Sequence, residues 1–205
     1  MELAGCKSVK GLWVPEDERD RAIERRFRAD AQIERVVARC KHRRTVVQAG
    51  GNWGYWPRKL AGMFDAVYTF EPNPVAFTAL AANTAGLPNV IRMQAALGYD
   101  CGLVGLQILE GRSGAAHVHG PGIIPTLRID LLGLASCDLT YLDIEGMELP
   151  ALMGGKETIA RCRPVVAFED KGHSARYGNG SCKEYLEGLG YRVVDKVGHD
   201  TVMAC

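Results

Sequence analysis

The 205-residue chain lacks the patterns that mark several classes of protein. It has no run of about 18 apolar residues, so no membrane-spanning helix is expected. Its seven cysteines form no Cys-x-x-Cys pair, and their scatter favours reduced thiols in a cytoplasmic protein over a disulfide framework or a zinc site. The first residues lack the basic and then apolar pattern of a signal peptide, and none is expected. The formal charge of +1 favours neither nucleic acid nor a membrane as a partner.

The first 44 residues predict a helical extension ahead of the main domain. Residues 1–14 show no regular pattern and are expected to be irregular. Pro15 and the three acids after it are typical of a helix N-terminus, because proline fits the first turn and acids interact favourably with the helix dipole. From there to about Cys40, a narrow apolar stripe among many charges favours an amphipathic helix packed on the domain. A lid over a ligand cleft or a binding arm is the alternative.

From residue 45 onward, strand and helix patterns alternate. We expect core strands at 45–49, 66–70, 90–97, 138–144 and 164–169, and helices at 55–64, 74–86, 148–162 and 181–189. Shorter strands are expected within 103–110 and 115–129, and a closing antiparallel hairpin at 191–197 and 200–204. This alternation predicts one α/β domain over residues 45–205, with a Rossmann-like, mostly parallel, doubly wound sheet. The sequence does not indicate an oligomeric state.

A glycine-rich turn, Gly50-Gly51-Asn52-Trp53-Gly54, joins the first core strand to its helix. Glycines allow a ligand to approach the backbone closely, and a helix N-terminus offers free N–H groups. Glu71 ends the next strand about 20 residues later, where an acid commonly accepts hydrogen bonds from the ribose hydroxyls of a nucleotide-like cofactor. Dinucleotides and S-adenosylmethionine both use this geometry, so the turn predicts a cofactor site without choosing between them.

Two carboxylates, Asp143 and Glu145, follow the fourth core strand. Residues two apart on an extended chain lie on the same side, so both can face one cleft at the carboxyl end of the sheet. Burying unpaired charge is costly; a cation, an ammonium group or a proton to be abstracted would explain the pair. Glu169 ends the fifth strand and is expected to converge with them. A direct base or positioning role is favoured, with a divalent cation or a structural role as alternatives.

Six motifs, in order, resemble the FkbM-type family of S-adenosylmethionine-dependent methyltransferases. They cover about residues 45–205, whereas residues 1–44 lie outside the resemblance. The resemblance implies a class I methyltransferase fold, with S-adenosylmethionine as cofactor. The matching pieces are Gln48 to Gly54, Phe70-Glu71-Pro72-Asn73-Pro74, Ala95-Ala96-Leu97-Gly98, Thr126-Leu127-Arg128-Ile129-Asp130, Asp143-Ile144-Glu145-Gly146-Met147-Glu148, and Arg163 to Glu169.

The resemblance also implies a role for each matching residue. It places the methionine half of the cofactor against Gly50, Asn52 and Gly54, and the ribose against Glu71 with Asn73 nearby. It places the adenine against Gln94, Ala95 and Ala96, and turns Asp143 toward the ammonium group or the transferred methyl. Independently of the resemblance, the expected convergence on the cleft makes Asp143, Glu145 and Glu169 the candidate catalytic carboxylates.

The chain departs from the family pattern at two positions. Gln48 stands where the family usually has Asp; it can still accept a hydrogen bond from the cofactor but carries no charge. Tyr141 stands where the family usually has Lys, which removes a cation near the two acids.

The expected reaction is O-methylation of a small molecule or sugar hydroxyl. A nucleic-acid base methyltransferase is disfavoured, because its usual Asn/Asp-Pro-Pro-aromatic signature is replaced by Asp143-Ile144-Glu145-Gly146. A nicotinamide-dependent oxidoreductase and a non-catalytic S-adenosylmethionine-binding protein remain alternatives.

The histidines do not predict a metal site. His117 and His119 would face one side of a strand, which could suit a metal, but no third ligand stands nearby and the flanks suggest an exposed hairpin. His173 follows Glu169 on a loop, where a solvated position is favoured over contact with a substrate.

Overall fold

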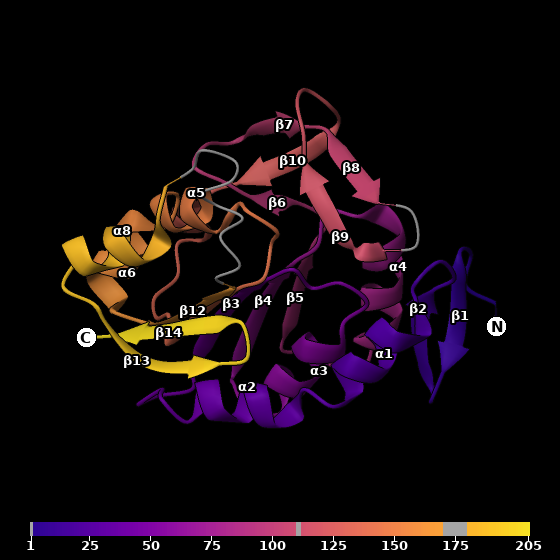
Figure 1. Cartoon of the computed structure of the whole chain (residues 1–205), viewed down its shortest axis with the longest axis horizontal. Coiled ribbons are helices and arrows are strands. Elements are labelled where there is room, and N and C mark those ends of the chain that lie inside the picture. Colours follow the sequence, from indigo (N-terminus) through magenta and orange to yellow (C-terminus); the bar gives the residue numbers. More distant parts are fainter. Residues whose placement is uncertain (1, 110–111, 170–179) are drawn as a thin grey trace.

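A seven-stranded sheet forms the centre of the protein (Figure 1). The computed structural model describes residues 2–109, 112–169 and 180–205. The five strands from β12 to β5 are parallel, β14 is antiparallel to β12, and β13 is antiparallel to β14. The order across the sheet is β13 (Arg192–Val197), β14 (Asp200–Ala204), β12 (Val165–Glu169), β11 (Leu139–Leu142), β3 (Thr45–Ala49), β4 (Ala66–Phe70) and β5 (Val90–Met93). The expected α/β fold with a mostly parallel sheet is therefore observed.

Successive side chains of a strand point to opposite faces of the sheet. The buried strands carry apolar side chains on both faces, and helices cover each face. Val46 belongs to the apolar core beneath α1 (Asp20–Phe27), α2 (Asp30–Val37) and α3 (Tyr55–Ala61). Val47 belongs to the core beneath α5 (Glu148–Met153), α6 (Lys156–Cys162) and α8 (Cys182–Gly188). Among the described residues, no helix is both long and apolar enough to cross a membrane.

Five short strands lie together above the central sheet in the view of Figure 1. They are β6 (Ala96–Leu97), β7 (Gly102–Val104), β8 (Leu106–Leu109), β9 (Arg112–Val118) and β10 (Ile124–Leu127). β6, β10 and β7 form one small sheet, and β8 and β9 form a hairpin. The single strand expected at 90–97 is wrong, because the chain leaves the central sheet after β5 and β6 then pairs with β10.

The expectation that residues 1–14 are irregular is also wrong. β1 (Cys6–Val9) and β2 (Leu12–Pro15) form an antiparallel hairpin. Its two-residue turn has positive φ at Lys10 (50°) and Gly11 (79°), the conformation that suits a tight hairpin. Asn83 of α4 (Pro74–Asn83) bonds both the N–H and the C=O of Trp13, at 2.8 and 2.7 Å. These bonds fix the hairpin to the domain.

The long helix expected after Pro15 is two helices, α1 and α2, and Pro15 ends β2 instead of opening a helix. The apolar stripe loses its helical spacing between Phe27 and Ile33, and the helices break at residues 28–29. The break lets both helices place apolar side chains in the same core as Val46.

The helix expected at 148–162 is likewise two helices, α5 and α6, separated by Gly154 and Gly155. A Cβ atom at Gly154 would lie 2.1 Å from the carbonyl oxygen of Gly98. Close packing of two backbones therefore requires glycine at this break.

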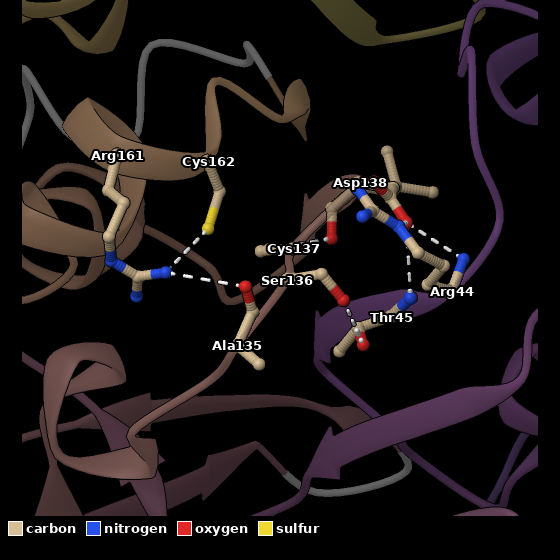
Figure 2. Close-up of polar contacts among 9 residues, drawn as sticks. Arg44, Thr45, Ala135, Ser136, Cys137, Asp138, Arg161 and Cys162 are labelled. Atoms are coloured by element: carbon tan, nitrogen blue, oxygen red, sulfur yellow. Dashed lines mark hydrogen bonds and ion pairs between the residues drawn. The ribbon is translucent and has the colours of Figure 1, made fainter.

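Asp138 joins the N-terminal ends of β3 and β11, at the end of the sheet opposite the glycine turn (Figure 2). Its carboxylate accepts hydrogen bonds from the Arg44 side chain, at 2.6 and 3.2 Å, and from the backbone N–H of Arg44 at 2.7 Å. Burial raises the pKa of Asp138, but the hydrogen bonds from Arg44 and Thr45 outweigh burial and lower the pKa below its ordinary value. This cluster aligns the starts of β3 and β11.

Candidate active site

The carboxyl ends of the parallel strands enclose a cavity of about 480 Å³, partly open to solvent. Neighbouring strands of a sheet lie roughly 4.8 Å apart, so residues that follow β4, β3 and β11 line the cavity side by side. The hairpin β8–β9 adds two residues from β9. The lining consists of Ala49, Gly50, Phe70, Glu71, Pro72, Ala95, Ala96, Leu97, Ala116, Val118, Asp143, Ile144, Glu145 and Met147.

Gly50 brings the turn after β3 against the loop after β11. Its φ is +83°, and a Cβ atom there would lie 2.0 Å from the carbonyl oxygen of Asp143. The backbone N–H of Asp143 in turn donates to the carbonyl oxygen of Ala49 at 3.1 Å. Glycine at position 50 is therefore required by packing of the protein itself, whether or not a ligand approaches the turn.

Glu71 is a cavity-lining carboxylate held by two backbone amides. The N–H of Asn52 donates to Glu71 Oε2 at 2.7 Å, and the N–H of Asn73 donates to Glu71 Oε1 at 2.8 Å. Burial raises the pKa of Glu71 to about 7. The two amides and the Arg26 guanidinium lower this pKa, and the Asp143 carboxylate raises it. Glu71 can therefore gain or lose its proton near neutral pH while its position is fixed.

Asp143, Glu145 and Glu169 come together as expected. One carboxylate oxygen from each lies within 4.8 Å of the others, close enough for the three to hold a divalent cation. All three side chains are partly buried. The cluster can therefore bind a cation or an ammonium group, or accept a proton.

The loop that carries Asp143 and Glu145 is shaped by Glu148. Its carboxylate accepts hydrogen bonds from the N–H groups of Ile144 and Gly146 at 3.1 and 3.0 Å. Glu145 has a positive φ of 53°, an uncommon conformation for a residue with a side chain. The bonds to Glu148 thus hold a sharp turn that presents Glu145 to the cavity.

Several of the expected cofactor residues support the site without lining it. Asn73 accepts a hydrogen bond from the Val75 N–H at 3.0 Å and so caps α4. Gln48 is buried; it accepts a hydrogen bond from the Thr69 hydroxyl at 2.6 Å and donates to the carbonyl oxygen of Ala49 at 3.1 Å. Asn52, Gly54 and Gln94 also lie outside the lining set.

Tyr141, at the second departure from the family pattern, points to the opposite side of β11 from the Leu142 core. Its hydroxyl donates to the Asp200 carboxylate, which also accepts a hydrogen bond from Gln32 Nε2 at 2.8 Å. Burial and the nearby Asp200 charge raise the pKa of Tyr141 well above its ordinary value. Tyr141 is therefore a neutral structural link between β11, β14 and α2.

The sequence did not predict two residues of the cavity wall, Ala116 and Val118, or the cation next to Asp143, Arg26. Ala116 and Val118 of β9 line the cavity, and no sequence motif marks them. His117 Nδ1, between them, lies 3.3 Å from the Glu145 carbonyl oxygen, whereas His119 is exposed. Arg26 of α1 pairs with Asp143 at 3.7 Å. His173 lies outside the described residues.

The polar groups fit an adenosyl cofactor. Glu71 and Asp143 line the cavity and offer carboxylate oxygens to hydroxyl and ammonium groups. Phe70, Ala95 and Leu97 supply an apolar wall suited to a purine ring. Acceptors for hydroxyl and ammonium groups thus stand beside an apolar slot.

A model of the methyltransferase FkbM domain matches residues 42–193. The chain belongs to the FkbM methyltransferase family. The resemblance seen in the sequence motifs is therefore confirmed. A search of curated proteins found no match to this FkbM-family chain.

Solved structures with the same fold include three of differing function. A methyltransferase FkbM from Methylobacillus flagellatus KT is 17% identical with a TM-score of 0.57, and the match covers 80% of this chain and 44% of that one. This chain thus spans less than half of that protein.

Two other solved structures match over most of their length. Precorrin 8w decarboxylase from Methanobacterium thermoautotrophicum is 16% identical with a TM-score of 0.52, and the match covers 86% of this chain and 88% of that one. Precorrin-6y C5,15-methyltransferase from Geobacter metallireducens GS-15 is 11% identical with a TM-score of 0.52, covering 97% and 92%. At these identities the likeness shows the fold alone.

Proposed function

We propose that this FkbM-family protein transfers a methyl group from S-adenosylmethionine to a hydroxyl group of a small molecule or sugar. The observation that carries the proposal is the Glu71 carboxylate, which lines the cavity at the end of β4 and is held by the N–H groups of Asn52 and Asn73. An acid at this place in a Rossmann-like sheet is suited to accept hydrogen bonds from both ribose hydroxyls.

The order of strands supports the remaining placement of the cofactor. Ala95, Ala96 and Leu97 follow β5 and would hold the adenine. Glu71 follows β4, and Gly50 and Asp143 follow β3 and β11, the next two strands. The methionine half would therefore extend from the ribose toward Gly50 and Asp143.

The chemistry requires alignment of an acceptor oxygen and removal of its proton. When bound, S-adenosylmethionine supplies a methyl group on a sulfonium; the C–S bond breaks as the C–O bond forms. The acceptor oxygen loses its proton to a carboxylate of the cluster Asp143, Glu145 and Glu169. A positioned base contributes about 10²–10⁴-fold to such a rate, and alignment contributes further.

The acceptor class follows from charge and from the residues after β11. The formal net charge is +1, which gives little attraction for nucleic acid or a membrane surface. The Asp143-to-Gly146 segment contains two carboxylates that could accept a hydroxyl proton, and it lacks the signature of base methyltransferases. A small-molecule or sugar hydroxyl is therefore the proposed acceptor.

Calorimetric titration with S-adenosylhomocysteine, with NADH as the control ligand, tests the cofactor. We expect one-to-one binding of S-adenosylhomocysteine and none of NADH; the reverse result would favour a nicotinamide-dependent oxidoreductase. Glu71→Ala should weaken binding at least about tenfold, because charge-assisted hydrogen bonds contribute roughly 1.5–3 kcal/mol. Glu34→Ala, at an exposed acid, should bind as the wild type does.

Methyl transfer is a separate measurement. Labelled S-adenosylmethionine and a panel of hydroxylated small molecules and sugars should yield a labelled product. Tight cofactor binding without transfer to any acceptor would favour a non-catalytic S-adenosylmethionine-binding protein.

A further inference from the structure

Arg26, in the segment before the FkbM domain, lies beside Asp143, a residue of the cavity wall. Its Nη1 is 3.7 Å from Asp143 Oδ2, and the two side chains are only 22% and 20% exposed. Asp143 lines the cavity. The segment ahead of β3 therefore brings a largely covered cation to a cavity-lining carboxylate.

Aromatic residues hold Arg26 in this place. The centre of its guanidinium lies 4.7 Å from the centroid of the Trp56 ring, and Trp56 stacks on Tyr141 with centroids 4.8 Å apart. Next to Arg26, Phe27 packs against Trp53 and Tyr55 at 5.7 and 5.1 Å. Helix α1 is thus anchored on the glycine turn and on the first turn of α3.

The Arg26 guanidinium retains free capacity to donate hydrogen bonds. An arginine carries five N–H donors, and its pairing with Asp143 at 3.7 Å is longer than a hydrogen bond. Among the described residues, none accepts a hydrogen bond from Arg26. A planar guanidinium with free donors is well suited to bind a carboxylate through two parallel bonds.

A guanidinium beside a carboxylate complements the two charges of an α-amino acid. The carboxylate attracts the ammonium group, and the guanidinium attracts the carboxylate that is attached to the same α-carbon. In the proposed function the methionine half of the cofactor lies at Gly50 and Asp143, and Arg26 pairs with Asp143.

We propose that Arg26 binds the α-carboxylate of the methionine half of S-adenosylmethionine, with Asp143 facing its ammonium group. This inference rests on the proposed function. It makes α1 part of the cofactor site and leaves Glu145 and Glu169 to face the acceptor.

Two ligands that differ only in the carboxylate test the proposal by calorimetry. They are S-adenosylhomocysteine and its decarboxylated analogue, S-adenosyl-3-thiopropylamine. Wild-type protein should prefer S-adenosylhomocysteine. Arg26→Gln should weaken S-adenosylhomocysteine at least tenfold, the effect of losing a charge-assisted pair, and should change the affinity for the analogue less than twofold.

Two further variants serve as controls. Arg26→Lys keeps the charge and should retain part of the preference for S-adenosylhomocysteine. Arg25→Gln removes a neighbouring exposed cation of the same helix and should bind both ligands as the wild type does.

The other outcomes are distinct. Equal weakening of both ligands in Arg26→Gln would show that Arg26 only supports the fold, and unchanged S-adenosylhomocysteine affinity would place the carboxylate elsewhere; either result would overturn the proposal. Failure of the wild type to bind S-adenosylhomocysteine would overturn the proposed function, and this inference with it.

Discussion

The backbone N–H of Asn52 donates a 2.7 Å hydrogen bond to the Glu71 carboxylate and so joins the glycine turn after β3 to the end of β4. Asn52 has a positive φ of 46°, which aims its N–H across the gap between the two strands. The carboxylate is thereby held in one orientation before any ligand binds, and this reduces the ordering cost of binding.

Cofactor affinity should depend on pH through Glu71. With its pKa raised to about 7 by burial, Glu71 is about one-tenth ionised at pH 6 and about nine-tenths ionised at pH 8. Because the ionised form is the better acceptor for ribose hydroxyls, S-adenosylhomocysteine affinity should rise up to about tenfold between these pH values. Calorimetry across this range checks it. Glu71→Gln should flatten the profile, and an unchanged profile in that variant would assign the titration to another group.

Ionisation of Glu71 should lower the stability of the protein as pH rises, whereas it raises cofactor affinity. The folded pKa of Glu71 is raised from 4.5 to about 7, so the folded state binds this proton more tightly than the unfolded state does. The contribution of Glu71 to the free energy of unfolding is therefore present below about pH 4.5 and declines as pH rises to about 7. Urea unfolding of the wild type and of Glu71→Gln at several pH values measures the difference. A difference that stays constant over this window would contradict the raised pKa.

Asp143→Asn should lower turnover more than it lowers stability. The substitution removes the charge that faces an ammonium group or a proton, while the N–H of Asp143 keeps its bond to Ala49. We expect a loss of at least about tenfold in turnover with an identified acceptor, within the range for a positioned acid or base. Urea unfolding controls for stability. Full activity in the folded variant would exclude both roles.

Tyr141→Phe should destabilise the protein without changing the cofactor site. It removes the hydroxyl that donates to the buried Asp200 carboxylate; among the described residues, this carboxylate then keeps the side-chain hydrogen bond from Gln32. The expected loss is about 1–3 kcal/mol of unfolding free energy, with S-adenosylhomocysteine affinity within twofold of the wild type. Tyr99→Phe, at a 56% exposed side chain, is the matched control and should leave both quantities unchanged. A large loss of affinity in Tyr141→Phe would give Tyr141 a role in the site.

Gly50→Ala should be strongly destabilising. A Cβ atom would lie 2.0 Å from the Asp143 carbonyl oxygen, at a φ of +83°. Left-handed strain and overpacking together cost roughly 2–6 kcal/mol. Thermal unfolding measures the effect against Gly86→Ala, where a Cβ would meet nothing within 4 Å. Similar midpoints for the two variants would show that the turn can move away from Asp143.

Local patterns in the sequence determined the parallel core and most of the candidate site. The apolar segments that became β3, β4, β11 and β12 are continuous and end in glycine or in acids, so their type and direction follow from residues near in sequence. Parallel strands bring their carboxyl ends to one edge, and this rule alone places Glu71 and Asp143 at one cavity and brings Glu169 close to Asp143. Glycines stand at the break between α5 and α6 and in the turn between β1 and β2, but a glycine alone does not distinguish a helix break or hairpin turn from other loops.

Only the tertiary structure decided which distant segments complete the cavity. Arg26 is 117 positions before Asp143 in the chain, and no local pattern distinguishes it from Arg25; packing of Phe27 on Trp53 and Tyr55 selects its orientation. The inward placement of β9 likewise depends on its pairing with β8 and on contacts with the loop after β11. The spacing of apolar side chains along a helix or strand predicts which of its faces is buried. Which other helix or strand packs against that face depends on close packing throughout the folded protein.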